Sequence, residues 1–213
     1  MTDKVTVDIW SDIACPFCYI GKKKFEAAVA QSGIPVTVTY RSFELGPNTP
    51  EDVAESHAYL LALKMGVSPD EAKAMEHQIT QAAEASGLEF RYDQLKPANT
   101  RKAHQLLHFA KAADKQVEMA ERLLAAHFTE GRHVGQIAEL VSLGAEVGLD
   151  PDEVTRVLES GEFLSEVDAD IAQAASLGIR GVPFFVLNGK YGVNGAQEPE
   201  QFVAALQQAQ QDQ

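Results

Sequence analysis

The first part of the chain alternates between hydrophobic and polar residues. This alternation predicts one β-strand over residues 4–10 and a second over residues 36–41. The segment between them predicts a helix over roughly residues 16–32, because Gly33 offers a helix stop and Pro35 a break. A strand, a crossover helix and a second strand of these lengths indicate a right-handed parallel pair.

From about residue 48 the hydrophobic residues recur at helical spacing instead. We expect residues 50–178 to be almost wholly helical, with an irregular link near residues 88–98. Asn99 is expected to cap one of these helices, which would run to about Ala113. Three further helix starts combine a capping side chain, a proline and an acidic residue, namely Thr49-Pro50, Ser68-Pro69 and Asp150-Pro151.

Strand signals return near the C-terminus. Residues 183–187 predict a strand, Asn188-Gly189 is typical of a two-residue hairpin turn, and residues 190–193 predict the returning strand. Pro199 opens a last helix, whose glutamine-rich end, residues 207–213, is expected to fray.

The order of elements is therefore β-α-β, a helical block, and then β-β-α. Neither end of the chain can form a covered sheet alone, whereas together they give a four-stranded sheet with helices on its faces, which is an α/β fold. We expect residues 1–47 and 162–213 to form this discontinuous domain and residues 48–161 to form a helical insertion domain.

The composition excludes several classes of function. The chain has 213 residues, of which 45% are hydrophobic, so it can bury a sizeable core. Its formal net charge of −13 argues against nucleic acid, which requires a basic footprint, and against a basic membrane-binding surface. The three consecutive lysines at 22–24 are expected to be a solvated helix face. No hydrophobic run approaches the ~18–20 residues of a membrane span, and the first residues lack a signal-peptide pattern. We therefore expect a cytoplasmic protein that binds neither nucleic acid nor membranes.

The chemistry of this sequence is concentrated at Cys15-Pro16-Phe17-Cys18. These are its only two cysteines, and a C-x-x-C pair beside a strand-helix-strand pattern is typical of a redox-active dithiol. Cys15 is expected at the N-cap of the predicted helix, with Pro16 at the first helical position. The unpaired N–H groups and positive end of a helix favour a thiolate, so we expect Cys15 to be the attacking thiol. Cys18, one turn further in and more buried, would be the resolving thiol.

A structural or zinc-binding pair is the alternative to a redox role. A closed zinc site needs four ligands, and finger-type sites place the second pair about 12–15 residues further on. His104 and His108 have a suitable mutual spacing but lie far beyond Cys18 in the sequence. We therefore expect no metal and no other cofactor.

Two stretches carry a resemblance to a known family. SDIACPFCYIGKKKFE, near the N-terminus, and the late GIRGVPFFVLNGKYGVNGAQ resemble the DsbA-like thioredoxin-fold oxidoreductases, in particular the cytoplasmic FrnE-type subgroup. The resemblance implies a thioredoxin-like fold with a large all-helical insertion. It also implies thiol–disulfide exchange at Cys15 and Cys18.

The resemblance further implies a cis peptide bond between Val182 and Pro183, facing the cysteines. The backbone of Val182 would then pair with an extended substrate like an added strand. Pro16, Phe17, Val182 and Pro183 are therefore expected to contact the substrate. From the residues alone, Pro183 also fits an ordinary trans-proline at the start of an edge strand.

Several polar residues allow two interpretations. Asp8, on the first strand, is either a proton acceptor beneath Cys18 or a solvent-facing residue near the strand end. His104 and His108 share one side of a predicted helix, and they either form a partly exposed face or line a substrate groove. The role of Asp12 is open.

The sequence favours a thiol–disulfide oxidoreductase that acts on protein disulfides or on small disulfides such as glutathione. The alternative is a glutathione-dependent isomerase or transferase of the 2-hydroxychromene-2-carboxylate isomerase or kappa-class type. These enzymes share the insertion architecture but typically carry serine where Cys15 stands. A non-enzymatic chaperone or binding module is a third hypothesis. The direction of electron flow, and whether the protein is a monomer or a homodimer, are left open.

Overall fold

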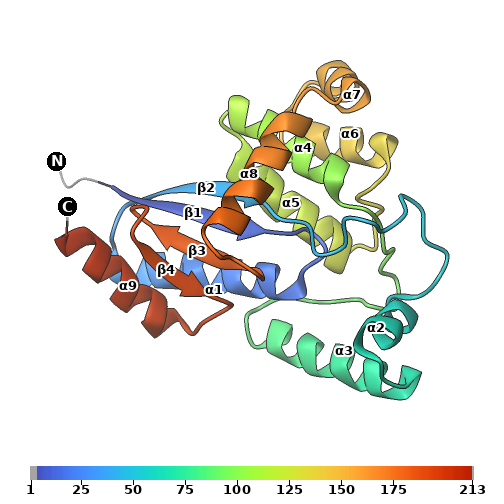
Figure 1. Cartoon of the computed structure of the whole chain (residues 1–213), viewed down its shortest axis with the longest axis horizontal. Helices are drawn as coiled ribbons and strands as arrows, with labels where there is room; N and C mark the ends of the chain where they lie inside the picture. Colours follow the sequence, from blue (N-terminus) through green and yellow to red (C-terminus); the bar gives the residue numbers. More distant parts are fainter. Residues whose placement is uncertain (1–3, 213) are drawn as a thin grey trace.

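One four-stranded sheet forms the centre of the computed structural model, which describes residues 4–212 (Figure 1). The strands among these residues are β1 (Val5–Ser11), β2 (Val36–Ser42), β3 (Phe184–Leu187) and β4 (Tyr191–Asn194). The helices in this part of the chain are α1 (Pro16–Ser32), α2 (His57–Met65), α3 (Pro69–Glu84), α4 (Arg101–Ala112), α5 (Gln116–Phe128), α6 (Ile137–Glu146), α7 (Pro151–Ser160), α8 (Leu164–Ser176) and α9 (Pro199–Gln211). Residues 1–3 and 213, which the predicted domain and the glutamine-rich stretch include, lie outside the described residues.

The strands lie in the order β2-β1-β3-β4. β1 and β2 are parallel, whereas β1 pairs with β3 and β3 with β4 in antiparallel fashion. The turn between β3 and β4 contains Asn188 and Gly189, which have positive φ angles of 50° and 66°. Asn-Gly favours this conformation in tight hairpins. The predicted α/β fold, in which the two ends of the chain share one sheet, is confirmed.

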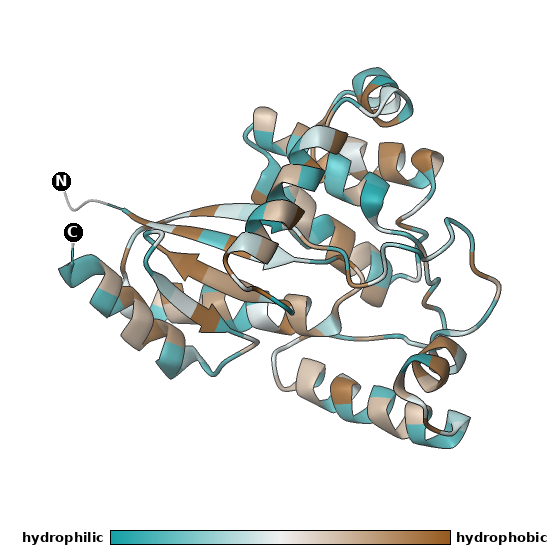
Figure 2. Ribbon diagram, viewed as in Figure 1, coloured by the Kyte–Doolittle hydropathy of each residue, from teal (hydrophilic) through white to brown (hydrophobic). Residues whose placement is uncertain are grey.

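Helices α1 and α9 cover one face of the sheet, and α8 packs against the other (Figure 1). On the first face, the Phe185 ring of β3 lies 5.4 Å from Phe25 of α1 and 4.6 Å from Phe202 of α9, measured between ring centroids. On the second face, the ring N–H of Trp10 donates to the carbonyl oxygen of Asp170 on α8 at 3.0 Å. The hydrophobic residues of β3 that these helices cover stand out in Figure 2. The helix that begins beside the cysteines is therefore packed directly onto the sheet.

The outer edge of β2 is covered by a side chain at Tyr40. The amide oxygen of Gln116, at the start of α5, accepts the N–H of Tyr40 at 3.0 Å. Its amide nitrogen donates to the Tyr40 carbonyl oxygen, also at 3.0 Å. One glutamine thus satisfies both backbone groups of an edge residue, as a neighbouring strand would.

The helical block between β2 and β3 shares a core with the sheet. Leu106 on α4 and Leu123 on α5 are fully buried in the same hydrophobic cluster as Val7 of β1. In Figure 1, α4 to α7 lie together, whereas α2 and α3 form a separate hairpin. The predicted boundaries of a separate insertion domain, at residues 47/48 and 161/162, stay predictions.

The helix start predicted at Thr49-Pro50 is wrong. Residues 43–56 are irregular, and α2 begins only after Ser56, whose hydroxyl accepts the Tyr59 N–H. The backbone of the predicted start is used elsewhere, since the Asn99 side chain donates to the Thr49 carbonyl oxygen at 2.9 Å. The Asn99 N–H donates to the Pro50 carbonyl oxygen at 3.1 Å. A tertiary contact therefore overrides this local signal.

The other two proline-containing starts are confirmed. Ser68 forms a full capping box with Glu71, and the Asp150 side chain accepts two backbone N–H groups of α7. Among the described residues α9 runs to Gln211, and the fraying expected of the C-terminal glutamines stays a prediction. Its last turns are held by the buried Ala209, whose carbonyl oxygen accepts the Asn188 side-chain amide at 2.9 Å.

Candidate functional site

The two cysteines lie at the start of α1. Cys15 is the N-cap and Pro16 the first helical residue, as the sequence predicts. Both thiols are free, and each cysteine is 3% exposed. Measured over the whole residue, Cys18 is therefore no more buried than Cys15, and the expectation that it would be is wrong. Phe17, between them, is 46% exposed and forms the outward surface of this turn.

The surroundings of Cys18 disfavour its ionised form. Burial raises the pKa of the Cys18 thiol well above its usual value, and the hydrogen bond and charge of Cys15 raise it further. The Ser11 hydroxyl and the Asp12 backbone N–H lower this pKa, but by less. Cys18 therefore keeps its proton at neutral pH, which suits a thiol that reacts second.

The late motif meets the cysteines in space. The peptide bond between Val182 and Pro183 is cis. The Cys15 thiol donates to the carbonyl oxygen of Val182 across a distance of 3.5 Å. Two segments that lie at opposite ends of the sequence thus form one surface around the Cys15 sulfur. Pro16 and Val182 are both partly exposed on it.

Gly21 of α1 holds Pro183 close to the cysteine helix. A Cβ atom at Gly21 would lie 2.9 Å from the Pro183 ring and 3.3 Å from the Ala196 side chain. We expect Gly21→Ala to lower both activity and stability, because the added methyl group displaces the Val182-Pro183 turn from Cys15. Overpacking costs about 1–3 kcal/mol, which exceeds the ~1 kcal/mol that alanine gains over glycine in a helix.

Urea unfolding and the rate of disulfide exchange would test this variant against Gly181→Ala. Gly181 lies beside Val182, but a Cβ atom there meets nothing within 4 Å. We expect the Gly181 variant to match the wild type. Equal behaviour of the two variants would contradict the close packing of Gly21 against Pro183.

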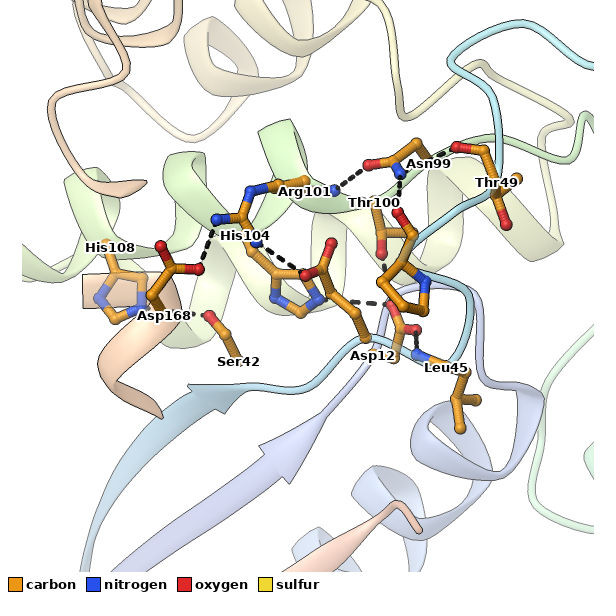
Figure 3. A network of polar contacts seen from close by, with 12 residues as sticks. Asp12, Ser42, Leu45, Thr49, Asn99, Thr100, Arg101, His104, His108 and Asp168 are labelled. Carbon is orange, nitrogen blue, oxygen red and sulfur yellow. Dashed lines mark hydrogen bonds and ion pairs between the residues drawn. The ribbon is translucent and has the colours of Figure 1, made fainter. Parts of the chain in front are cut away.

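Asp12, in the loop before Cys15, belongs to a network of polar contacts with α4 and with the segment after β2 (Figure 3). The Asp12 side chain is buried and accepts the Thr100 hydroxyl at 2.7 Å and the Leu45 N–H at 2.7 Å. The ring nitrogen Nε2 of His104 lies 3.4 Å from the same carboxylate. Thr100 is the N-cap of α4 without making a capping bond, since its hydroxyl is directed to Asp12. The Asn99 side chain accepts the Arg101 N–H instead.

The prediction of a partly exposed face at His104 and His108 is wrong. His104 is fully buried, and His108 is 7% exposed. The Nε2 atom of His108 lies 3.1 Å from the Ser42 hydroxyl and 3.1 Å from the Asp170 carboxylate. His108 therefore joins α4 to β2 and α8, and neither interpretation of this residue from the sequence describes it.

Asp8 does not lie beneath Cys18. Its carboxylate accepts the Arg41 guanidinium at 2.7 Å, and Arg41 also binds Asp170 of α8. Strand alternation puts Asp8 on the α8 face of the sheet, since Ile9 faces the core beside α1. The residue of β1 that affects Cys18 is Ser11, whose hydroxyl lowers the pKa of the thiol. Ser11 lies on the same face of the sheet as Ile9.

Lys22 is not part of a solvated face. Its side chain is 4% exposed, and its ammonium group lies 2.5 Å from both Glu26 and Glu121 of α5. Glu121 also accepts the Tyr19 hydroxyl at 2.8 Å. Lys22 lies four residues after Cys18, so the sequence alone predicts that both side chains lie on the same side of the helix. Its partner Glu121 lies too far away in the sequence to be found by spacing.

Metal and membrane signatures are absent from residues 4–212. No group of three or more histidine, cysteine or acidic residues there is arranged to hold a metal ion. None of the helices in this range combines the length and the apolar character that crossing a bilayer requires.

Comparisons with known proteins identify the family. A family model described as the DSBA-like thioredoxin domain matches residues 6–207. The structure of a "probable DsbA oxidoreductase" from Streptomyces coelicolor is 39% identical and superposes with a TM-score of 0.90, covering 98% of this chain and 91% of that one. The uncharacterized protein YwbO of Bacillus subtilis (strain 168) is 29% identical over 209 residues, which are 97% of this chain and 98% of that protein.

A second solved structure shares the fold at lower identity. The cytosolic disulfide reductase DsbM from Pseudomonas aeruginosa is 21% identical, with a TM-score of 0.69 over 98% of this chain and 100% of that one. DsbM has also been solved with GSH. The match of the family model across almost the whole chain agrees with the observed fold and with the quoted motifs. The chain therefore belongs to the family of DSBA-like thioredoxin domains.

Proposed function

We propose that this protein is a thiol–disulfide oxidoreductase whose reactive groups are Cys15 and Cys18. The observation that carries the proposal is the contact between the Cys15 thiol and the Val182 carbonyl oxygen, with Cys18 one helical turn away. This arrangement places the Cys15 sulfur beside a backbone segment that can pair with an extended chain.

The two cysteines have different roles in this proposal. Cys15 stands at the N-cap of α1, at the positive end of the helix dipole, and its side chain makes no hydrogen bond to the first turn of the helix. The Cys15 thiolate attacks a substrate disulfide, forms a mixed disulfide and releases one substrate sulfur as a thiolate. Cys18 then attacks the Cys15 sulfur, so that the Cys15–Cys18 disulfide forms and the second substrate sulfur leaves. In the oxidising direction the same steps run in reverse.

The substrates are proposed to be proteins or small molecules that carry a thiol or a disulfide. Pro16, Phe17, Val182 and Pro183 would contact them. The structure of DsbM with GSH supports glutathione as one candidate substrate of this protein. Assignment to the FrnE-type subgroup and to the cytoplasm stays a prediction.

Trapping of mixed disulfides tests the assignment of the two roles. We expect Cys18→Ser, in its reduced form, to accumulate mixed disulfides through Cys15 when it is incubated with insulin that retains its disulfide bonds, because Cys15 attacks a disulfide and nothing resolves the product. Cys15→Ser is expected to accumulate none. Non-reducing electrophoresis followed by mass spectrometry of the linked peptides measures both variants.

Equal trapping by the two variants would show that the roles are assigned wrongly. The alternative hypothesis, a glutathione-dependent isomerase or transferase, is tested in parallel. The assay measures conjugation of an electrophile to glutathione in the absence of any dithiol. Conjugation that survives Cys18→Ser, together with no insulin reduction by the wild type, would favour that reading over the proposed one.

A further inference from the structure

Helix α2 is hydrophobic on all sides but lies at the outside of the molecule (Figure 2). Seven of its nine residues are hydrophobic, and only Ala58 and Ala62 among them are buried. The element that α2 packs against most is α3. A helix of this composition is ordinarily enclosed by protein on every side. The exposure of α2 therefore indicates a face that a further polypeptide covers.

The exposed face of α2 consists of two ridges. Tyr59 and Leu63, one turn apart, are 48% and 64% exposed. Leu60, which is partly buried, and Lys64, which is exposed, form the ridge beside them. Leu63 is the most exposed of the large hydrophobic residues in the described part of the chain. The face is thus a short apolar strip that carries one charged group.

Two opposite charges lie at the two ends of this helix. Glu55 precedes the N-cap residue Ser56, and Lys64 lies in the last turn. Both side chains are exposed, and neither forms an ion pair within residues 4–212. An acid at one end and a base at the other suit contact with the same helix running in the opposite direction, because each charge then meets its opposite. The charges therefore favour a second copy of this chain over an apolar peptide as the occupant of the face.

We propose that the α2 face is the contact between two copies of this protein, which pair α2 against α2 about a two-fold axis. In this antiparallel arrangement Leu60 of each copy lies level with Leu63 of the other. Tyr59 lies level with Lys64 of the second copy. Glu55 is then about 6 Å along the helix axis from that lysine, within reach of the two side chains. The contact is self-complementary, so every favourable pair occurs twice.

The size of this contact determines its strength. Stable interfaces bury about 1,200–2,000 Å² in total, and smaller ones are typically transient. The nine residues of α2 span only about 14 Å, so the contact lies at the small end of this range. The dimer is therefore expected to dissociate on dilution, with the monomer dominant at low micromolar concentration and the dimer at several hundred micromolar.

Sedimentation equilibrium of the full chain over this concentration range tests the proposal. A reductant keeps the cysteines from linking two copies, and an ionic strength of about 0.15 M screens the repulsion between two chains of net charge −13. We expect the average mass to rise with concentration from 23.1 kDa toward twice that value.

Leu63→Glu is expected to raise the dissociation constant at least tenfold, because it brings an acidic group against Leu60 of the second copy. Leu177→Glu is the matched control, since Leu177 is also an exposed leucine, 55% exposed, but lies at the C-terminal end of α8. We expect the control to associate as the wild type does. Urea unfolding checks that both variants are folded.

Reversal of the two charges tests the two-fold arrangement itself. Glu55→Lys and Lys64→Glu each place like charges opposite one another at two symmetric positions, and we expect each to weaken association about three- to tenfold. The double variant has opposite charges again and is expected to associate as the wild type does. A double variant that is weaker than either single one overturns the antiparallel contact.

The proposal is also overturned if the protein stays monomeric at every concentration, or if Leu63→Glu associates as strongly as the wild type. If the wild type is monomeric and Leu63→Glu reduces insulin more slowly than Leu177→Glu does, the face binds a substrate polypeptide instead of a second copy. None of the mass measurements depends on Cys15 or Cys18. A protein that forms the dimer but reduces no disulfide would therefore contradict the proposed function and leave this contact standing.

Discussion

Lowering the pH from 6.5 to about 3 is expected to remove up to about 5 kcal/mol of unfolding free energy through His127 alone. His127, in the last turn of α5, is 2% exposed. Burial, followed by the charge of His57, lowers the pKa of His127 from 6.5 to about 3. Between these two values the unfolded chain binds a proton that the folded chain does not, at a cost of about 1.36 kcal/mol for each pH unit. The contribution is therefore unchanged above pH 6.5 and falls steadily below it.

Urea unfolding at pH 7.5 and pH 5.0 measures this effect, with about 2 kcal/mol of the loss falling in that interval. Asp12 and Asp170 do not contribute to the change in this range. Their pKa values are lowered in the folded protein, so the stabilisation that they provide is lost only at more acidic pH. We expect His127→Gln to flatten the pH dependence, and a matched change at the exposed His77 to leave it as in the wild type. A pH dependence that survives in His127→Gln would show that another group is responsible.

Phe185→Ala is expected to lower the free energy of unfolding by about 3–5 kcal/mol, a large fraction of the ~5–15 kcal/mol typical of a domain. Phe185 is fully buried and packs between Phe25 of α1 and Phe202 of α9. Removal of its ring leaves a cavity between the helix that carries the cysteines and the strand that follows Pro183. The midpoint of urea unfolding, at an unchanged slope, measures the loss.

Phe185→Leu is the matched variant for this prediction. Leucine keeps most of the buried volume, so we expect a loss well below that of alanine. Because Phe185 lies two residues from Pro183, we also expect the alanine variant to exchange disulfides more slowly than the leucine variant at a temperature where both are folded. A loss below about 1 kcal/mol in the alanine variant would mean that the three rings are not a central part of the core.

Local signals account for the parts of the fold that the sequence predicts well. The helix over residues 16–32 begins at a proline and ends at Gly33, whose φ of 65° is left-handed. The hairpin at Asn188 follows in the same way from residues that favour positive φ. In each case the residues that determine the structure lie inside the element, so periodicity and capping chemistry are sufficient.

The polar surroundings of the cysteines depend on partners that are distant in the sequence. Asp12 is bound by Thr100, and Lys22 is bound by Glu121. Neither bond leaves a pattern of spacing, so a buried lysine and an anchored carboxylate both look like ordinary surface charges in the sequence. The error at Thr49-Pro50 has the same cause, because Asn99 binds that segment from outside it.

The side-chain amide of Gln116 bears on whether copies of this protein can aggregate through the edge of the sheet. Growth of a sheet by adding a foreign strand requires free backbone donors and acceptors along an outer strand. At Tyr40 those groups are already occupied, so an incoming strand would have to break two hydrogen bonds to pair with this residue. The opposite border, at β4, is only four residues long and includes Gly192. Strand addition is therefore disfavoured at Tyr40 on one border of the sheet by a side chain, and on the other border by the short length of β4.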